Sequence, residues 1–410
     1  MNDTRFWVGI DLGSQAHQVC VLNEQREVVL ERTVEHSGAA LTALADELVA
    51  LAGGAADAIR VTTETPQSAV VETLLERGIA VFAINPKQLD RFRDRHTVAG
   101  AKDDRRDAFV LAQSLCTDGH LFNQVRLGSC ALVELRALNR MREELLVETN
   151  VLCNRIDSEL LRFFPEFRSL GSVQSDPWLT ELLELAPSPA QAKMLRRPRL
   201  RILLKKNRIR KHTAESVHAA LQGPSVHVAP GVAEAASRHI QMLVPRLRLV
   251  REQERRCERD IEQLLEKLSE SEPDSEGQCD AAIVQSLPGA GTIVSATLLA
   301  EAWQTLADRD YPRLRSLSGV APITKRSGKS TRVEMRRACN SRLRDGVYQW
   351  ALCCLRRDER TKVHYGRLRA RGHSHGRAIR GVADRLLSLL IALLRRGELF
   401  DPARRTLQTP

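Results

Sequence analysis

The stretch Phe6-Trp7-Val8-Gly9-Ile10-Asp11 is an apolar run that ends in a carboxylate. Such a run predicts a buried β-strand. Two further β-rich runs follow at 18–22 and 28–34, and the polar residues 23–26 between them indicate a hairpin. An unpaired charge at the end of a buried strand is costly, so Asp11 is expected to have a partner.

Strands and helices alternate from this point to about residue 117. Apolar residues at helical spacing fill 41–51, further strands are expected at 59–64 and 79–84, and helical periodicity returns through 108–115. Three adjacent strands followed by helix, strand, helix, strand and helix predict an α/β layer with a mixed sheet.

Long helices are expected in the middle of the chain. Residues 130–164 predict one helix, which Pro165 ends, and a second is expected to begin after Pro245. Apolar residues over 247–268 alternate spacings of three and four, which is a heptad seam. The seam predicts a coiled coil, either with 130–164 of the same chain or between two chains.

Four segments are therefore predicted: an α/β domain at 1–125, long helices at 126–278, an all-α domain at 279–400, and a tail at 401–410. Between the long helices, residues 196–211 hold nine basic residues and no acidic one. This stretch is either a solvated loop or a patch that binds a nucleic-acid backbone.

Composition narrows the function classes. The 410 residues carry 62 Lys and Arg against 51 Asp and Glu, a formal net charge of +11, which favours a polyanionic partner or reflects a coding bias towards Arg. Aromatic residues make up 4% of the chain, so base stacking cannot be the main mode of any nucleic-acid contact.

The longest apolar run, 386–394, is too short for a membrane helix, and no signal peptide is expected at the start. The nine scattered cysteines argue against a disulfide framework and fit a reducing cytosol.

Four carboxylates form the first chemical constellation. Asp11 and Glu64 end neighbouring predicted strands, while Asp104 and Asp107 are three residues apart at the head of a helix and share its face. Crowded carboxylates raise one another's pKa unless a cation neutralises them, and hard oxygen ligands suit Mg²⁺ or Mn²⁺. A pair of such ions about 4 Å apart can attack phosphodiesters. Each acid taken alone could instead be a surface carboxylate or a helix cap.

These residues resemble a known signature. Val8-Gly9-Ile10-Asp11, Thr63-Glu64 and Lys102-Asp103-Asp104-Arg105-Arg106-Asp107-Ala108 resemble the Asp-Glu-Asp-Asp pattern of a RuvC-like, RNase H-type domain. More narrowly, they look like the DEDD insertion-sequence transposases, insertion-sequence family one hundred and ten, described as bridge-RNA-guided recombinases. Asp103 stands where that family usually has Thr, so Asp103 remains an alternative to Asp104 as a ligand. Lys102 and Arg105 of the same segment are predicted to contact nucleic acid.

The second constellation begins at Ser286-Leu287-Pro288-Gly289-Ala290-Gly291-Thr292, ahead of an apolar helix. A turn with Gly289 and Gly291 that leads into a helix N-terminus offers backbone N–H groups to a phosphate. It resembles a helix-hairpin-helix DNA-backbone element, which opens the C-terminal domain in the family. The alternative is an ordinary helix–helix connection.

Ser327 is the predicted nucleophile. The segment Leu317–Pro322, followed by Lys325-Arg326-Ser327-Gly328-Lys329-Ser330-Thr331-Arg332, resembles the family segment that carries the nucleophilic serine. Lys325, Arg326, Lys329 and Arg332 could stabilise the charge of a phosphodiester under attack. Ser330 is the alternative nucleophile, and a flexible basic loop is the alternative to a site. Arg336 and Arg337 begin a further basic segment predicted to contact DNA.

The resemblance implies a composite site in which Ser327 joins the four carboxylates, from one protomer or from two. It also implies a transient phosphoserine bond to donor and target DNA, a structured guide RNA, a dimer or tetramer, and a bacterial cytoplasmic location at the nucleoid, without membrane attachment. Two other functions remain open. One is a metal-dependent junction nuclease that uses the carboxylates alone, and the other is a nucleic-acid-binding protein without catalysis.

Overall fold

The computed structural model describes residues 4–95, 103–223, 226–229, 231–270, 278–328 and 330–403. Two of the predicted contact residues, Lys102 and Lys329, lie outside these ranges. The chain divides into two compact units, Met1–Leu127 and Gly128–Pro410. Each unit is described by itself.

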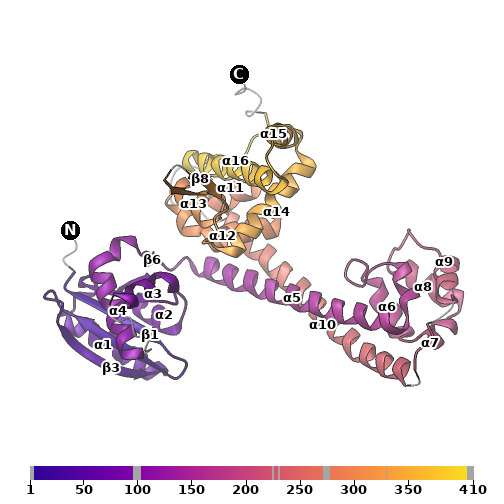
Figure 1. Cartoon of the computed structure of the whole chain (residues 1–410), viewed down its shortest axis with the longest axis horizontal. Helices are drawn as coiled ribbons and strands as arrows, with labels where there is room; N and C mark the ends of the chain where they lie inside the picture. Colours follow the sequence, from indigo (N-terminus) through magenta and orange to yellow (C-terminus); the bar gives the residue numbers. More distant parts are fainter. Residues whose placement is uncertain are drawn as a thin grey trace. The chain divides into compact units, whose positions relative to one another are not determined.

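A six-stranded mixed sheet forms the first unit (Figure 1). Its strands are β1 (Phe6–Leu12), β2 (Ala16–Leu22), β3 (Val28–Glu35), β4 (Ile59–Thr63), β5 (Ala80–Ala83) and β6 (Asn123–Val125), in the order β3-β2-β1-β4-β5-β6. β4 is parallel to β1 and β5, and the other pairs are antiparallel. The predicted mixed α/β sheet is confirmed, and its RuvC-like character stays a prediction. The short edge strand β6 was not expected, because three residues are too few for a periodic signal.

Helices cover the two faces of this sheet. α1 (Gly38–Leu51) and α2 (Ala69–Glu76) bury apolar residues against Val8 and Ile10 of β1. α3 (Pro86–Asp94) and α4 (Asp104–Asp118) belong to smaller apolar clusters that include Trp7. Successive strand residues point to opposite faces, so Trp7, Gly9 and Asp11 lie on the α4 face.

Two long antiparallel helices run through the second unit. They are α5 (Cys130–Phe163) and α10 (Val232–Glu270), and Arg142 pairs with Glu258 while His239 pairs with Glu159. The predicted start of the second helix after Pro245 is wrong. Pro245 lies inside α10 on its exposed side, and burial of Ile240, Val244 and Leu247 on the opposite side offsets the helix-breaking effect of proline.

The heptad seam of α10 faces α5 of the same chain. Cys257 and Ile261 of the seam are buried, and the Cys257 thiol donates a hydrogen bond to the Leu138 carbonyl. Of the two arrangements that the spacing allowed, the structure has the one within the chain. The seam therefore gives no support to a contact between two chains.

The segment between the long helices is itself helical. Residues Pro165–Leu170, α6 (Trp178–Leu185), α7 (Pro189–Lys193), α8 (Arg197–Lys206) and α9 (Ala214–Leu221) enclose a core with the end of α5 and the start of α10. The basic stretch forms α8, so the alternative of a solvated loop is wrong for 197–206. α8 buries Leu200, Leu203 and Leu204 on one side, while Arg201 and Lys206 pair with the acids Glu215 and Glu181.

The C-terminal part holds α11 (Asp280–Ser286), α12 (Thr292–Ala307), α13 (Tyr311–Leu317), α14 (Ser341–Arg357), α15 (Glu359–Ala370) and α16 (His375–Arg396). Its apolar core includes Leu135 of α5 and Ile261 of α10. The prediction of an all-α domain is wrong in one respect, because β7 (Ile323–Ser327) and β8 (Ser330–Glu334) form an antiparallel hairpin. The β-branched residues Ile323, Thr324 and Val333 suit a strand, but the surrounding Lys and Arg mask the pattern.

Across the described residues, no helix combines the length and the apolar character that a membrane crossing requires.

Candidate functional site

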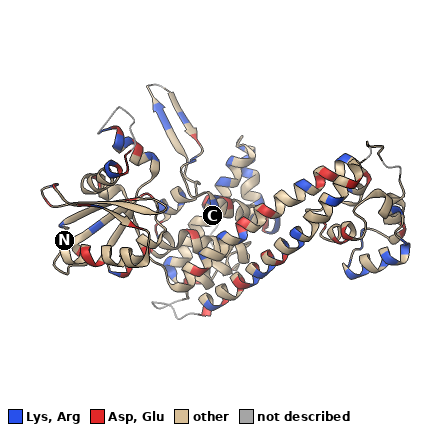
Figure 2. Cartoon of the chain, turned by 90° about the horizontal axis from the view of Figure 1, so that it is seen from below, with Lys and Arg blue, Asp and Glu red and all other residues tan. Residues whose placement is uncertain are grey.

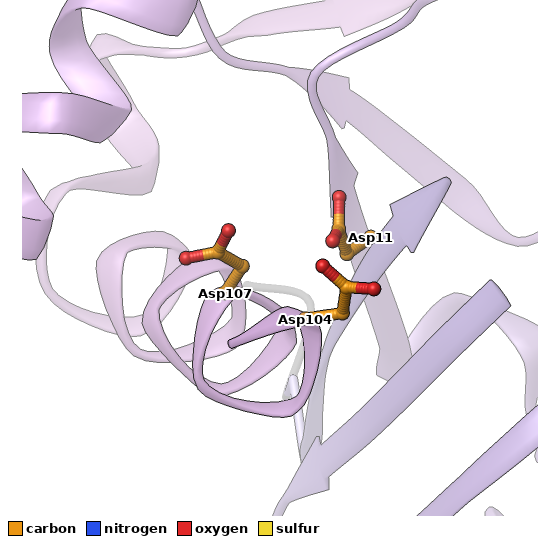
Figure 3. A group of neighbouring side chains, drawn as sticks. All are labelled: Asp11, Asp104 and Asp107. Atoms are coloured by element: carbon orange, nitrogen blue, oxygen red, sulfur yellow. The ribbon is translucent and has the colours of Figure 1, made fainter. Parts of the chain in front are cut away.

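Three carboxylates converge at one end of the sheet in the first unit (Figure 3). Asp11 lies near the end of β1, and Asp104 and Asp107 lie in the first turns of α4. One carboxylate oxygen from each lies within 4.8 Å of the others. The predicted convergence of the acids thus has a structural counterpart for three of the four.

The start of α4 separates two candidate ligands. The Asp103 side chain is the N-cap of the helix and accepts a hydrogen bond from the Arg105 amide at 3.2 Å. Asp104 is the first helical residue, and Asp107, one turn on, is buried with 2% of its surface exposed. Carboxylates in a first helical turn are favoured by the helix dipole, which offsets part of their mutual repulsion. This geometry places Asp104 in the cluster and gives Asp103 a capping role.

Gly9 sets the distance between α4 and β1. A Cβ atom built on Gly9 would lie 2.0 Å from the Ala108 carbonyl oxygen and 2.5 Å from the Ala112 nitrogen. The helix backbone therefore rests directly on the strand backbone two residues before Asp11. Only a residue without a side chain permits this approach.

Arg93 of α3 is a member of the site that sequence reasoning missed. Its guanidinium donates to both Asp107 oxygens, at 2.7 and 2.8 Å, and to Glu64 Oε1 at 3.2 Å. Burial acts to lower the pKa of Arg93, but the hydrogen bonds and charge of Asp107 and the charge of Glu64 raise it above its usual value. No sequence signal separates Arg93 from the neighbouring Arg91 and Arg95.

Glu64 follows β4 immediately and joins the site through Arg93. It is not one of the three residues whose oxygens form the close group. The guanidinium that bridges Glu64 and Asp107 is a cation already positioned among the carboxylates. The four predicted acids therefore lie around one edge of the sheet, three in direct proximity and one through an arginine.

The donor set fits a hard divalent cation. Three carboxylates from two elements offer hard oxygen ligands and leave positions for water or phosphate, which is the environment that Mg²⁺ and Mn²⁺ prefer. One of the three, Asp107, is nearly inaccessible to water, and in this structure the Arg93 guanidinium supplies the positive charge that such a carboxylate requires.

Arg105, a predicted nucleic-acid contact, lies beside this site. Its Nε donates to Glu31 of β3 at 2.6 Å, and this bond and its charge hold the pKa of Glu31 below its usual value. Both side chains are accessible to solvent, so this ion pair lies at the surface beside the carboxylate group.

Ser327 lies at the end of the hairpin in the second unit. The hairpin projects from the body of that unit (Figure 2). Ser327 ends β7 and is paired with Ser330, the first residue of β8, across a turn in which Gly328 has a φ of +55°. Both serines are exposed. The hydroxyl groups of both predicted nucleophiles are therefore accessible from solvent at the tip of the hairpin.

The register of the hairpin determines which of the surrounding cations lie on the same face as Ser327. Cross-strand partners share a face and successive residues alternate, so Ser327, Ser330, Lys325 and Arg332 lie on one face. Arg326 belongs to the opposite face. Lys325 and Arg332 are held by Glu334 at 2.8 and 3.1 Å. The hydrogen bond from Lys325 lowers the pKa of Glu334. Of the described cations predicted around Ser327, two are on its face and Arg326 is not.

The return strand leads into a buried polar network. The Asn340 side chain caps α14 and donates to Glu301 Oε2 at 2.7 Å, and Arg140 of α5 donates to Glu301 Oε1 at 3.1 Å. Burial acts to raise the pKa of Glu301, but these hydrogen bonds and the charges of Arg140 and Arg136 lower it. Arg336 donates to the Ala321 carbonyl at 3.3 Å, whereas Arg337 is exposed. The base of the hairpin is therefore anchored to the long helix.

The glycines ahead of α12 have different environments. Gly289 has a φ of +74°, and a Cβ there would lie 2.8 Å from Cys354 Sγ, so this glycine packs against α14. Gly291 is the exposed N-cap of α12 and has no side-chain cap hydrogen bond. Gly289 is half-buried, so Gly291 is the more accessible of the two for the predicted phosphate contact.

Comparison with known proteins agrees with this architecture. Residues 8–165 match a transposase family named for the DEDD signature of IS110. Residues 281–366 match the transposase family IS116/IS110/IS902. The chain belongs to the IS110 transposase family. The two matched segments contain the carboxylate cluster and the serine hairpin, respectively, so the expected family is confirmed at both ends of the chain.

Individual relatives support the same family. The chain is 41% identical over 216 residues to a Sinorhizobium fredii protein named as a transposase, y4uE, a match that spans 52% of the chain and 60% of that protein. It is 29% identical over 406 residues to a Streptomyces coelicolor protein named as the mini-circle transposase for IS117, and this match spans 97% of the chain and 95% of the relative. An uncharacterized protein of insertion element IS110 from the same species is also 29% identical, over 97% of the chain.

Proposed function

We propose that this IS110-family protein is the transposase of a mobile insertion sequence, and that it cuts and rejoins DNA with Ser327 as nucleophile. The observation that carries the proposal is the group of three carboxylates, Asp11, Asp104 and Asp107, at the head of α4. Family membership supports DNA as the substrate. The exposed serine pair on a basic hairpin supports a covalent route.

The carboxylates would hold Mg²⁺ or Mn²⁺, with Glu64 joining them when Arg93 moves aside. Such an ion, when bound, supplies positive charge that activates a hydroxyl and stabilises a leaving oxygen. The protein's part is to hold Asp104 and Asp107 on one helix face against β1, so that little rearrangement is needed.

In the serine step, a P–O bond to serine replaces the P–O bond of DNA that is broken. The Ser327 oxygen attacks phosphorus and forms an Oγ–P bond, the bond from phosphorus to the 3′ oxygen breaks, and the serine proton leaves to solvent or to the departing oxygen. A 3′ hydroxyl of another strand then attacks the phosphoserine and restores the serine. Because each step exchanges one P–O bond for another, rejoining needs no ATP. Lys325 and Arg332 share the serine face and would stabilise the phosphate under attack.

A structured guide RNA and assembly of more than one copy belong to the same proposal. The net charge of +11 and the low aromatic content favour recognition of duplexes through backbone and shape. The carboxylate group and Ser327 belong to different units of the chain, so two protomers would be able to supply one each. RNA that copurifies with the protein and a mass determined by light scattering test these two points.

The rival function is a nuclease that uses the carboxylates alone. The test incubates the full-length protein and its RNA with a plasmid that carries the gene and its native flanks, in the presence of Mg²⁺. We expect rejoined products and a protein–DNA adduct in the wild type, and neither in Asp11→Asn. Free DNA ends without an adduct would favour the nuclease, and unchanged activity in Asp11→Asn would remove the metal site from the reaction.

A further inference from the structure

A cavity of about 320 Å³ lies at the base of the serine hairpin. The turn Ser318–Val320, Met335 immediately after β8, α14 and α16 line it. Neither the carboxylate cluster nor the serine face uses these residues. We propose that this cavity receives one unstacked nucleobase of the DNA strand that the hairpin engages, a proposal that rests on the DNA-processing function above.

The walls offer apolar faces to a flat ligand. Half-buried Tyr348 contributes an aromatic ring and Met335 an exposed thioether side chain, over a buried aliphatic floor of Val320, Val347, Ile379 and Ala383. Every nucleobase has a π-face that can stack on an aromatic side chain. The volume lies within the range of small-molecule sites and accommodates a base with its sugar.

The rim carries positive charge suited to the phosphates on either side of such a base. Arg344 and Arg380 line the cavity. Arg344 donates to the exposed Asp345 at 2.9 Å and also interacts with the Cys339 thiol, and Asp345 itself lines the cavity. Arg380 contacts the Met335 sulfur at 3.5 Å, and within the described residues it forms no ion pair with a carboxylate. With two arginines and one aspartate at its border, the apolar cavity keeps a net positive rim, which suits a base on a phosphate backbone better than a cationic ligand.

The position of the cavity along the hairpin sets which base would enter. Ser327 pairs with Ser330 at the tip, and Met335 follows the last residue of β8. At about 3.3 Å per residue, the tip serines lie about 16 Å from the cavity. A stacked strand rises about 3.4 Å per nucleotide, so the captured base would lie about four or five nucleotides from the cut phosphodiester.

The test measures binding of full-length protein to two labelled DNA duplexes by fluorescence anisotropy. One duplex carries a single bulged adenine and the other an abasic bulge at the same place. We expect the wild type to prefer the adenine bulge about 10-fold, because stacking of a base on an aromatic side chain strengthens binding and an abasic bulge cannot stack. Tyr348→Ala should lose this preference and still bind the abasic duplex as the wild type does. Met335→Trp, at an exposed position at the cavity, should reduce the preference as well.

Tyr365→Ala is the matched control. Tyr365 lies on α15, bonds to His375 at 2.8 Å and does not line the cavity, so this variant should keep the preference. Equal wild-type binding to both duplexes, or a preference that survives Tyr348→Ala and Met335→Trp, would overturn the base site while leaving DNA binding intact. Failure of the wild type to bind either duplex would instead count against the DNA function itself. A stronger preference for the same bulge in RNA, or a change of oligomeric mass in the two cavity variants, would also overturn the proposal.

Discussion

Replacement of Gly9 by alanine tests whether the contact between β1 and α4 builds the carboxylate site. The new Cβ would lie 2.0 Å from the Ala108 oxygen, 2.5 Å from the Ala112 nitrogen and 2.8 Å from the Leu111 Cβ. Two of these three atoms are helix backbone, so no side chain can turn aside. The helix must move away from the strand.

The size of the movement follows from the distances. Heavy atoms in contact approach to about 3.5 Å, so α4 has to shift by about 1 Å or more, and Asp104 and Asp107 shift with it relative to Asp11. Overpacking of this kind costs about 1–3 kcal/mol of stability. For a unit of this size, the unfolding temperature should fall by about 4–10 °C. A misplacement of about 1 Å at a reacting centre can lower the rate of strand cutting about 100-fold.

Gly38→Ala is the matched control in the same unit. Gly38 is exposed at the start of α1, and a Cβ there meets nothing within 4 Å. This variant should have the unfolding temperature of the wild type or slightly higher, because alanine favours a helix. Thermal unfolding with and without Mn²⁺ and the strand-cutting rate are measured for both variants. If Gly9→Ala had the stability of the wild type and were stabilised by Mn²⁺ to the same extent, the close contact between β1 and α4 would not set the geometry of the carboxylate site.

Three further outcomes are expected. Arg93→Ala leaves buried Asp107 without its counter-ion and should cost about 3 kcal/mol in the absence of metal. Millimolar Mn²⁺ should then raise the unfolding temperature of this variant more than that of the wild type, and an equal rise in both would contradict it. Glu301→Gln should destabilise the protein at pH 7, because the folded pKa of Glu301 lies below the reference value of 4.5 and its charge stabilises the fold above that pH. The difference in unfolding temperature between the wild type and Glu301→Gln should shrink as the pH falls below about 4.5 and through the folded pKa. A difference that grows over this pH range would contradict a stabilising charge on Glu301. Pro245→Ala should stabilise α10 by about 1–2 kcal/mol, since Pro245 is exposed inside the helix, and a lower unfolding temperature would show that proline is needed there.

Periodicity in the sequence predicted the elements whose patterns are strong. The first five strands and the helix 130–164 follow directly from apolar spacing, as does the heptad seam of α10. Pro245 misled the prediction of where α10 starts, because a local helix breaker competes with apolar contacts that only the folded core reveals. The hairpin was missed because its five-residue strands lie among charged residues.

In the site, too, the residues found from the sequence are those with a local spacing pattern, and the residues missed are those that only folding brings together. Spacing of three placed Asp104 and Asp107 on one face, and the carboxylate at the end of β1 pointed to Asp11. Arg93 could not be found in this way, because its role arises only where α3 and α4 meet beside the sheet. The network of Glu301, Arg140 and Asn340 joins residues 161 and 39 positions apart in the chain, which no local pattern records.

The proposed role of Ser327 predicts which atom of the protein becomes bonded to DNA, and mass spectrometry can identify that atom. The full-length protein is incubated with its RNA, Mg²⁺ and the plasmid carrying the native element flanks, then denatured, digested with nuclease and protease, and analysed by mass spectrometry. We predict a nucleotide attached to Ser327, present in Ser330→Ala and absent from Ser327→Ala. Cut DNA with no modified serine, or with the nucleotide on Ser330, would contradict the account.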